Sequence, residues 1–328
     1  MINSRKIDHL RICVEEDVEA GDAGFSSVNL VHKALPELDY DEIDTRIQLL
    51  GKKLGFPLII ESMTGGTKES ESINKDLALI AQEYGIGMGL GSQRAAIEDK
   101  QLSATYTVRD VAPDILLIAN LGAVQLNHEY SEKECMKAID MVNADAIALH
   151  INPLQEIIQP EGDRNFKGLI SKINSVKKSL KKPVILKGVG EGISLDTASR
   201  ITVDAFDVGG VGGTSWSLVE SHRLNGLESE IGMTFAGWGI PTVECVRELR
   251  NLKKPLIASG GVRSGLDAAK AIAVGADAVG VALPLLRAYN KQGLDGLRNY
   301  LDKFISEFKA AMFLTGCIDV RALKGISE

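Results

Sequence analysis

Eight short, almost entirely apolar runs constrain the fold of this chain more than any other feature. Their first residues are 21 to 51 positions apart. Several of them, such as ILLIA at 115–119 and AVGVA at 278–282, lack the polar–apolar alternation of a half-exposed strand. Such runs are typical of strands buried on both faces of a parallel sheet. The predicted strands are Pro57–Glu61, Tyr84–Gly89, Ile115–Ala119, Asp145–His150, Pro183–Lys187, Asp204–Val208, Pro255–Ser259 and Asp277–Ala282.

Segments with helical periodicity separate these runs. The spacing of Ile73, Leu77, Ile80 and Ala81 predicts one apolar helix face. A second face is predicted from Leu297, Leu301, Phe304, Phe308 and Met312, and the Ala-rich segment 266–274 ends before Gly275. Eight strands alternating with helices predict a (β/α)8 TIM barrel. The alternative is an open doubly wound sheet, but that fold usually has GxGxxG after its first strand, where this chain has Met63-Thr-Gly-Gly66.

The whole chain, 1–328, is predicted to be one domain. Residues 1–56 precede the barrel and are expected to form an arm or cap, and the barrel itself takes 57–328. The 51-residue interval after the sixth strand contains an expected insertion, Ser215–Gly239. A phrase that recurs at Asn143-Ala-Asp and Gly275-Ala-Asp indicates repeated helix-to-strand units.

Charge and composition exclude several kinds of partner. With 37 basic and 44 acidic residues, the net charge of −7 argues against broad nucleic-acid binding. The four cysteines are far apart and are read as reduced thiols. The polar N-terminus and the lack of a stretch of about 20 apolar residues predict a cytoplasmic protein without a membrane span.

Polar residues and glycines follow nearly every predicted strand, whereas Pro and Asp precede them. In such barrels the active site lies at the carboxyl ends of the strands. Glycine-rich loops follow the last three strands, and backbone N–H groups in such loops can bind phosphate. Gly260, Gly261 and the Ala282–Leu283 turn are therefore candidates for a phosphate site. The alternative is that these glycines only form tight turns.

Four side chains carry possible chemistry. Lys187 ends a buried strand, where it could be a nucleophile, a phosphate partner, a cation beside a flavin or a rim lysine. Glu156 could hold Mg²⁺ together with substrate phosphates, or be an ordinary first-turn helix residue. His9 and His150 could act as acids or bases, although a single histidine is more often structural.

An ordered set of motifs resembles one known family, the type 2 isopentenyl-diphosphate isomerases, along nearly the whole chain. HINPLQE followed by EGDRNF is the specific part of the resemblance. The motifs are Arg5-Lys-Ile-Asp-His9, Met63-Thr-Gly-Gly66, Gly91-Ser-Gln-Arg94, His150-Ile-Asn-Pro-Leu-Gln-Glu156, Glu161-Gly-Asp-Arg-Asn-Phe166, Lys187-Gly-Val-Gly190, Gly212-Gly-Thr214 and Ser259-Gly-Gly-Val-Arg263.

The resemblance implies an FMN-dependent barrel enzyme that interconverts isopentenyl and dimethylallyl diphosphate in isoprenoid biosynthesis. It also implies that reduced FMN is the active form, with Mg²⁺ as metal and NADPH as reductant. Because the reaction has no net redox change, the flavin is expected to move a proton rather than a hydride. The implied assembly is a homotetramer or homo-octamer.

The resemblance also implies residue roles. Gln155, His150 and Lys187 would be catalytic, and Glu156 would bind the metal. The substrate would contact Arg5, Lys6, His9, Ser92, Gln93, Arg94, Asn152 and Gln155. FMN would contact Met63, Thr64, Gly65, Ser92, Asn120, Lys187, Thr214, Gly261, Val262, Arg263, Ala282 and Leu283.

Two other classes of function remain open on the sequence. One class is an FMN-type oxidoreductase. An enzyme like IMP dehydrogenase would need a Cys in the loop after the sixth strand, where Gly209–Ser217 has none, and a 2-hydroxy-acid oxidase would need a catalytic His, for which His222 is the candidate. A flavin-binding or phosphate-sensing protein without activity would not explain the combination of Arg5, Lys6, Arg94 and Glu156.

Overall fold

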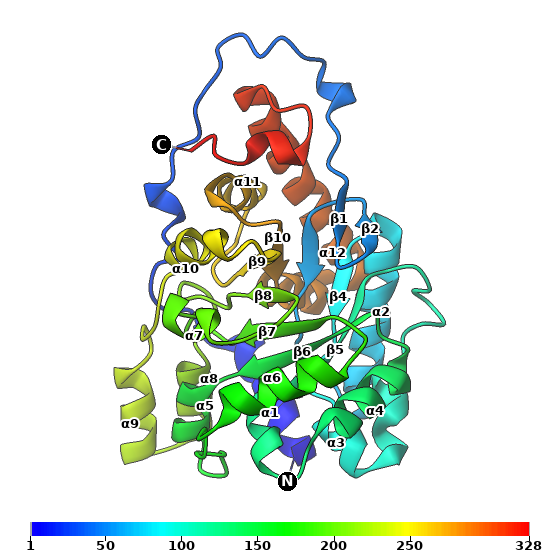
Figure 1. Ribbon diagram of the computed structural model, residues 1–328, viewed down its shortest axis with the longest axis vertical. Helices are drawn as coiled ribbons and strands as arrows, with labels where there is room; N and C mark the ends of the chain where they lie inside the picture. Colours follow the sequence, from blue (N-terminus) through cyan, green and yellow to red (C-terminus); the bar gives the residue numbers. More distant parts are fainter. Residues whose placement is uncertain (1, 328) are drawn as a thin grey trace.

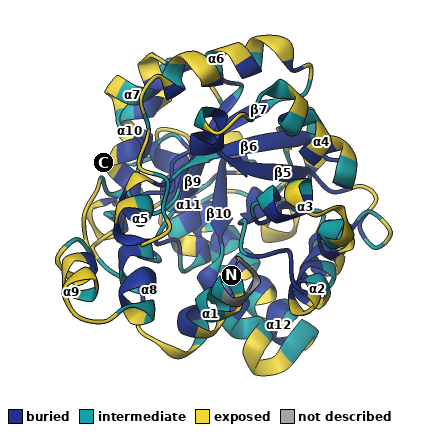
Figure 2. Cartoon of the chain, turned by 90° about the horizontal axis from the view of Figure 1, so that it is seen from below, coloured by how far each residue is buried: buried dark blue, intermediate teal, exposed yellow. Residues whose placement is uncertain are grey.

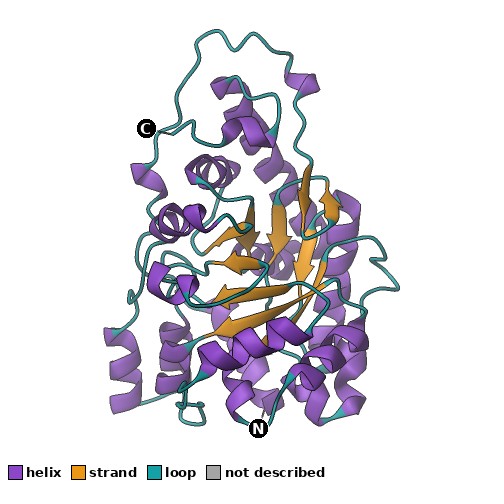
Figure 3. Cartoon of the chain, viewed as in Figure 1, coloured by secondary structure: helices purple, strands orange, loops and turns teal. Residues whose placement is uncertain are grey.

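The computed structural model describes residues 2–327 and contains a closed barrel of eight parallel strands (Figure 3). Strands neighbour one another in the order β10-β3-β4-β5-β6-β7-β8-β9, so the barrel closes between the last strand and the first. The strands are β3 (Leu58–Ile60), β4 (Gly87–Gly89), β5 (Leu117–Gly122), β6 (Ala146–Ile151), β7 (Val184–Gly188), β8 (Ala205–Asp207), β9 (Leu256–Ser259) and β10 (Ala278–Val281). The predicted barrel and all eight predicted strands are confirmed.

One strand boundary differs clearly from the prediction. The second run was predicted to begin at Tyr84, but the preceding helix continues through Tyr84 and β4 begins at Gly87. The helix ends at Gly85, which has a φ of 62°. Glycine adopts this left-handed conformation without steric cost, so it separates the helix from the strand.

Helices cover the outside of the barrel and bury one face each (Figure 2). The predicted apolar faces are confirmed, because Leu77 in α2 and Leu301 and Phe308 in α12 are fully buried. Segment α12 is broken at Gln292 and Gly293. The helices around the barrel are α2 (Lys68–Tyr84), α3 (Arg94–Glu98), α4 (Glu132–Val142), α5 (Pro153–Ile158), α6 (Leu169–Ser179), α7 (Leu195–Ser199), α10 (Thr242–Leu249), α11 (Gly265–Val274) and α12 (Leu283–Thr315).

The aspartates that precede the strands join neighbouring strands. Asp145 Oδ2 accepts a hydrogen bond from the Leu117 amide at 3.0 Å, and Asp277 Oδ2 accepts one from the Leu256 amide at 2.8 Å. Asp204 makes the equivalent contact with Val184. The repeated phrase in the sequence therefore reflects a repeated structural need, which is to bond the first amide of the neighbouring strand.

Residues 2–56 extend along the barrel from one end to the other (Figure 1). Helix α1 (Ile2–Glu15) lies at the carboxyl ends of the strands, as expected for a cap. The chain then runs outside α10 and α11 to a hairpin of β1 (Ile47–Leu49) and β2 (Lys52–Leu54). Leu49 and Leu54 pack with interior residues of the barrel such as Ile59. Helix α1 therefore lies at the mouth of the barrel, whereas the hairpin closes the opposite end.

The predicted insertion after the sixth strand is helical. It forms α8 (Trp216–Arg223) and α9 (Leu227–Thr234), which pack on each other. Val219 of α8 shares a small apolar cluster with Ile12 and Val18 of the arm and Leu286 of α12. This cluster fixes α1 over the barrel mouth. In the described part of the chain, no helix combines the length and the apolar character needed to cross a membrane.

Candidate active site

The carboxyl ends of the strands and helix α1 enclose a cavity of about 280 Å³. Most of the residues predicted to bind substrate, cofactor or metal line it. They are Arg5, Lys6, His9, Met63, Thr64, Ser92, Arg94, Asn120, His150, Asn152, Gln155, Glu156, Lys187, Thr214, Gly261, Arg263, Ala282 and Leu283. The fold therefore brings residues from all parts of the sequence to one site.

Three predicted site residues do not line the cavity. Gln93 is fully buried. Its side-chain amide donates to the Ala138 carbonyl at 2.8 Å and accepts from the backbone N–H of Asn120 at 3.0 Å. These bonds exclude its side chain from substrate. Gly65 lies against the ring of Tyr106, and the Val262 side chain is buried in the core. A ligand could therefore contact Gly65 and Val262 only through their backbone atoms.

Lys187 lies between two carboxylates. Its Nζ is 2.6 Å from Glu61 Oε2 and 2.8 Å from Asp207 Oδ2. Burial alone would lower the pKa of Lys187, but the charges of Asp207 and Glu61 outweigh it and raise this pKa. Lys187 is therefore a charged ammonium, which excludes the Schiff-base role that requires a neutral amine. Neither carboxylate was among the predicted site residues.

His150 is a neutral imidazole at the cavity wall. Burial, and then the charge of Lys187 on the neighbouring strand, lower its pKa to about 4. Its Nδ1 is 2.7 Å from Asn120 Oδ1. Because a carboxamide oxygen only accepts, Nδ1 carries the hydrogen and Nε2 is left as an acceptor.

Helix α1 brings three further polar side chains, Arg5, Lys6 and His9, into the cavity. Lys6 Nζ donates to the Gly65 carbonyl at 2.5 Å and lies 2.8 Å from the Tyr106 hydroxyl. Burial, with the nearby charge of Arg5, lowers the pKa of Lys6 to about 8. Arg5 pairs with Glu161 at 3.3 Å. Both cations therefore belong to helix α1, the part of the N-terminal arm that lies over the mouth of the barrel.

Glu220 is a site residue that sequence reasoning missed. It is fully buried on α8 and lies 3.0 Å from His9 Nε2, while Gln155 Nε2 donates to it at 2.9 Å. Burial favours its neutral form, but His9, Gln155 and Arg223 hold the pKa of Glu220 at about 2. Because Glu220 lies in an insertion and not after a strand, its place in the sequence gave no signal.

Glu156 is held in one orientation. Its Oε1 accepts from Asn152 at 2.9 Å and its Oε2 accepts from the Asp163 amide at 2.6 Å. Burial raises the pKa of Glu156, and these two hydrogen bonds oppose the effect. Within residues 2–327, no cluster of three or more His, Cys, Asp or Glu side chains could hold a metal. A cation here would need most of its ligands from a phosphorylated substrate and water.

The loop after β9 fits a phosphate group. Gly260 and Gly261 have φ values of 100° and 75°, and a Cβ on Gly261 would collide with Ala23. No described residue accepts a hydrogen bond from the amides of Gly261 and Val262. Arg263 lies beside them. Free amides near a guanidinium are suited to a dianionic phosphate such as that of FMN.

Two further residues bear on the rival functions. Cys13 borders the cavity from α1, which was not expected, but burial raises its pKa to about 12 and makes it a poor nucleophile. His222, the candidate for a hydroxy-acid oxidase, is exposed on α8 and does not line the cavity. Neither Cys13 nor His222 therefore offers the reactive group that those oxidoreductases would use.

Comparison with known proteins identifies a family profile and solved structures that share this fold. The sequence profile of the FMN-dependent dehydrogenase family matches residues 114–326. A flavocytochrome b2 variant with pyruvate bound superimposes with a TM-score of 0.70 at 18% identity, covering 98% of this chain and 82% of the other. A mandelate oxidase variant with an FMN adduct gives 0.64, also at 18% identity, over 98% and 90%. The profile match places the chain in the FMN-dependent dehydrogenase family, and the two superpositions show the same barrel fold.

Closer relatives specify the family. The chain is 50% identical to the isopentenyl-diphosphate delta-isomerase of Nostoc sp., over 98% of this chain and 94% of the relative. It is 48% identical to the protein of the same name from Archaeoglobus fulgidus, over 99% and 94%. The chain therefore belongs to the isopentenyl-diphosphate delta-isomerase family, which confirms the family predicted from the motifs.

Proposed function

We propose that this protein interconverts isopentenyl and dimethylallyl diphosphate, using reduced FMN and Mg²⁺, with NADPH as the reductant. The observation that carries the proposal is that one cavity combines a phosphate loop at Gly260 and Gly261 with a second set of cations at Arg5, Lys6 and Arg94. One set suits the FMN phosphate and the other suits a diphosphate.

Two of these cations, Arg5 and Arg94, are paired with carboxylates of the segment 161–163. Arg5 contacts Glu161 at 3.3 Å, and Arg94 contacts Asp163 at 3.4 Å. A diphosphate would compete for these guanidinium groups, and Glu156 would hold Mg²⁺ against it. The carboxylate is already oriented by Asn152, so the cation would bind without reorganising the site.

A shift of the double bond requires a proton to be added at one carbon and removed from another. Bound reduced FMN would supply an electron-rich ring with a protonatable nitrogen. His150 and Gln155 are the polar groups of the chain in the cavity that would orient the reacting atoms. Gln155 is anchored by Glu220, and His150 by Asn120, so both side chains have fixed positions. Helix α1 would exclude water from the reactive intermediate.

The test is to reduce the FMN-loaded protein anaerobically with Mg²⁺ and follow isopentenyl diphosphate by NMR in D₂O. Deuterated dimethylallyl diphosphate, formed without consumption of reduced flavin, is the expected product. Unchanged substrate, or flavin oxidation in step with turnover, would overturn the proposal. The flavin is first reduced chemically with dithionite, and a second run with NADPH as the only reductant tests the proposed reductant. Gel filtration and light scattering test the proposed tetramer or octamer, and the cytoplasmic location remains a prediction.

A further inference from the structure

A cluster with more carboxylates than cations forms the top layer of the barrel interior. Glu61 follows β3, and Lys187, Asp207 and Ser259 are in β7, β8 and β9. Glu61, Lys187 and Ser259 also line the active-site cavity. Beneath them the interior is apolar, with Ile59, Ile118, Ile185 and Ile257. The charges therefore lie at the boundary between the barrel core and the bound ligand.

The two carboxylates engage one ammonium. Glu61 Oε2 and Asp207 Oδ2 lie 2.6 and 2.8 Å from Lys187 Nζ, and the Ser259 hydroxyl donates to Asp207 Oδ1. Glu61 Oε1 is buried without a hydrogen-bond partner among the residues that the structure describes. Gly280 faces it, and a Cβ there would collide with this oxygen. The backbone of β10 thus leaves space for the Glu61 carboxyl group.

Packing alone does not account for this arrangement. A buried ion pair contributes little more than apolar side chains of the same volume, and often less. A second carboxylate adds unbalanced negative charge, and an unpaired buried oxygen adds a further cost. Burial, and then the charge of Asp207, raise the pKa of Glu61 to about 7. The cluster maintains this costly charge at the wall of the ligand site.

We propose that Glu61 and Asp207 are positioning residues that fix the Lys187 ammonium beside bound FMN and offset its positive charge. The inference rests on the proposed function, because it takes Lys187 to contact the flavin. A lone cation beside the ring would favour the reduced, anionic flavin and raise its reduction potential. The two carboxylates counteract that effect. The reduction potential of bound FMN is therefore lower than it would be beside Lys187 without them.

The experiment measures the midpoint potential of FMN bound to the wild type, Glu61→Gln and Asp207→Asn. Both substitutions keep the shape of the side chain and remove its charge. Glu244→Gln is the matched control, because Glu244 is exposed on α10 and is not among the residues that line the cavity. We expect the potential to shift to more positive values in both cluster variants and to stay at the wild-type value in the control.

The outcomes separate this inference from the proposed function. Wild-type protein that does not bind FMN or does not isomerise the substrate contradicts the proposed function. Wild-type protein that does both, with unchanged potentials in folded, FMN-loaded Glu61→Gln and Asp207→Asn, overturns the positioning role alone. A shift in only one variant assigns the role to that carboxylate and removes it from the other.

If neither variant folds, the visible spectrum of oxidised FMN bound to the wild type decides. The charged groups that face Glu61 are Lys187 and Asp207. His150 lies on β6, next to the strand of Lys187, and is neutral near pH 7. A spectral transition near neutral pH supports the proposal, and a constant spectrum overturns it. Lys6 also titrates near this range, so the measurement is repeated on Lys6→Met, in which the transition should persist.

Discussion

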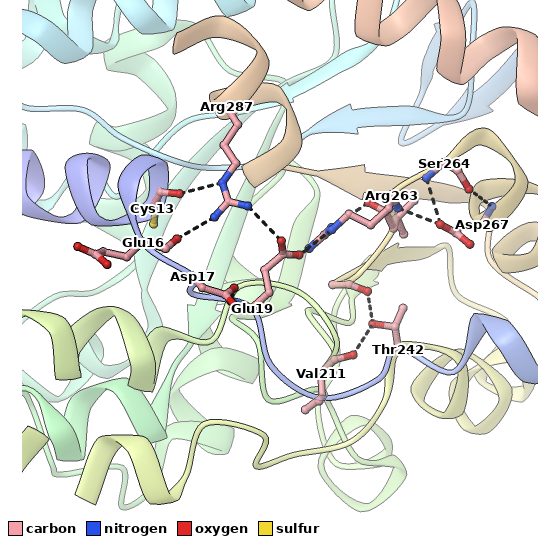
Figure 4. A network of polar contacts seen from close by, with 12 residues as sticks. Cys13, Glu16, Asp17, Glu19, Val211, Thr242, Arg263, Ser264, Asp267 and Arg287 are labelled. Atoms are coloured by element: carbon pink, nitrogen blue, oxygen red, sulfur yellow. Dashed lines mark hydrogen bonds and ion pairs between the residues drawn. The ribbon is translucent and has the colours of Figure 1, made fainter. Parts of the chain in front are cut away.

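The carboxylate of Glu19 pairs with the guanidinium of Arg263, although the two residues are 244 positions apart (Figure 4). Arg263 Nε is 2.7 Å from Glu19 Oε1, and Arg287 lies 3.3 Å from the other oxygen. Arg287 also donates to the carbonyls of Cys13 and Glu16, at the end of α1 and just beyond it. The phosphate loop and the arm that carries Arg5, Lys6 and His9 are therefore connected through one carboxylate.

This relationship predicts opposite effects of two substitutions on FMN affinity. Arg263→Met should weaken FMN binding by about 10- to 100-fold, because a charge-assisted contact with the phosphate is lost. Glu19→Gln should strengthen it, because a competing negative charge is removed from Arg263. Fluorescence titration of the apoprotein with FMN measures both, and riboflavin serves as the control ligand without a phosphate. Weaker binding in Glu19→Gln would contradict the competition.

Glu156→Gln should reduce isomerase turnover by at least about 100-fold, because the amide is a poor ligand for Mg²⁺. FMN affinity should be unchanged, since the phosphate loop is on a different strand. Turnover measured across a range of Mg²⁺ concentrations checks this. Glu161→Gln is the comparison, because Glu161 contacts Arg5 and not the proposed metal position. Equal activity of Glu156→Gln and wild type at limiting Mg²⁺ would remove Glu156 from the metal role.

His150 predicts a specific pH dependence of stability. Its pKa is about 4 in the folded protein, against 6.5 for an unperturbed histidine. Because the unfolded state binds the proton more readily, this residue's contribution is fully present above pH 6.5 and is lost as the pH falls toward 4. The loss amounts to about 3 kcal/mol.

The measurement is the free energy of urea unfolding of the wild type and His150→Gln over this range. Glu61 and Glu191, whose pKa values are raised to about 7 and about 8, act in the opposite direction. Their contributions cancel when the two proteins are compared. The free energy of unfolding of the wild type minus that of His150→Gln should therefore decrease as the pH is lowered from 6.5 to 4. A difference that stays constant would show that His150 is not held neutral.

Leu49→Ala should destabilise the protein by about 2–5 kcal/mol, because it leaves a cavity where the β1–β2 hairpin closes the barrel. The hairpin lies at the end opposite the active site, so the Kd of FMN should not change. Thermal and urea unfolding of the FMN-free protein measure the effect. Lys53→Ala, at an exposed position of the same hairpin, should change stability by less than about 0.5 kcal/mol. Equal stability of both variants would mean that the hairpin does not close the core.

Local sequence rules predicted the elements well because their causes are local. A continuous apolar run such as 115–119 can only be satisfied by burial on both faces, and a spacing such as Leu297, Leu301 and Phe304 requires a helix. The position of the site followed from one topological fact, that the carboxyl ends of all barrel strands lie at the same end. Those rules could not show that Gln93 turns its amide into the wall, since its partners Asn120 and Ala138 come from other units.

The sequence by itself determined the barrel, the family and most of the residues that line the cavity, because periodicity, glycine positions and motifs are properties of neighbouring residues. Only the tertiary structure decided which charges meet. Glu61 and Asp207 both contact Lys187 because the closed barrel directs side chains from separate strands to one interior point. Glu220 reaches Gln155 because the insertion folds back beside the mouth. Such contacts depend on through-space geometry, which no spacing along the chain encodes.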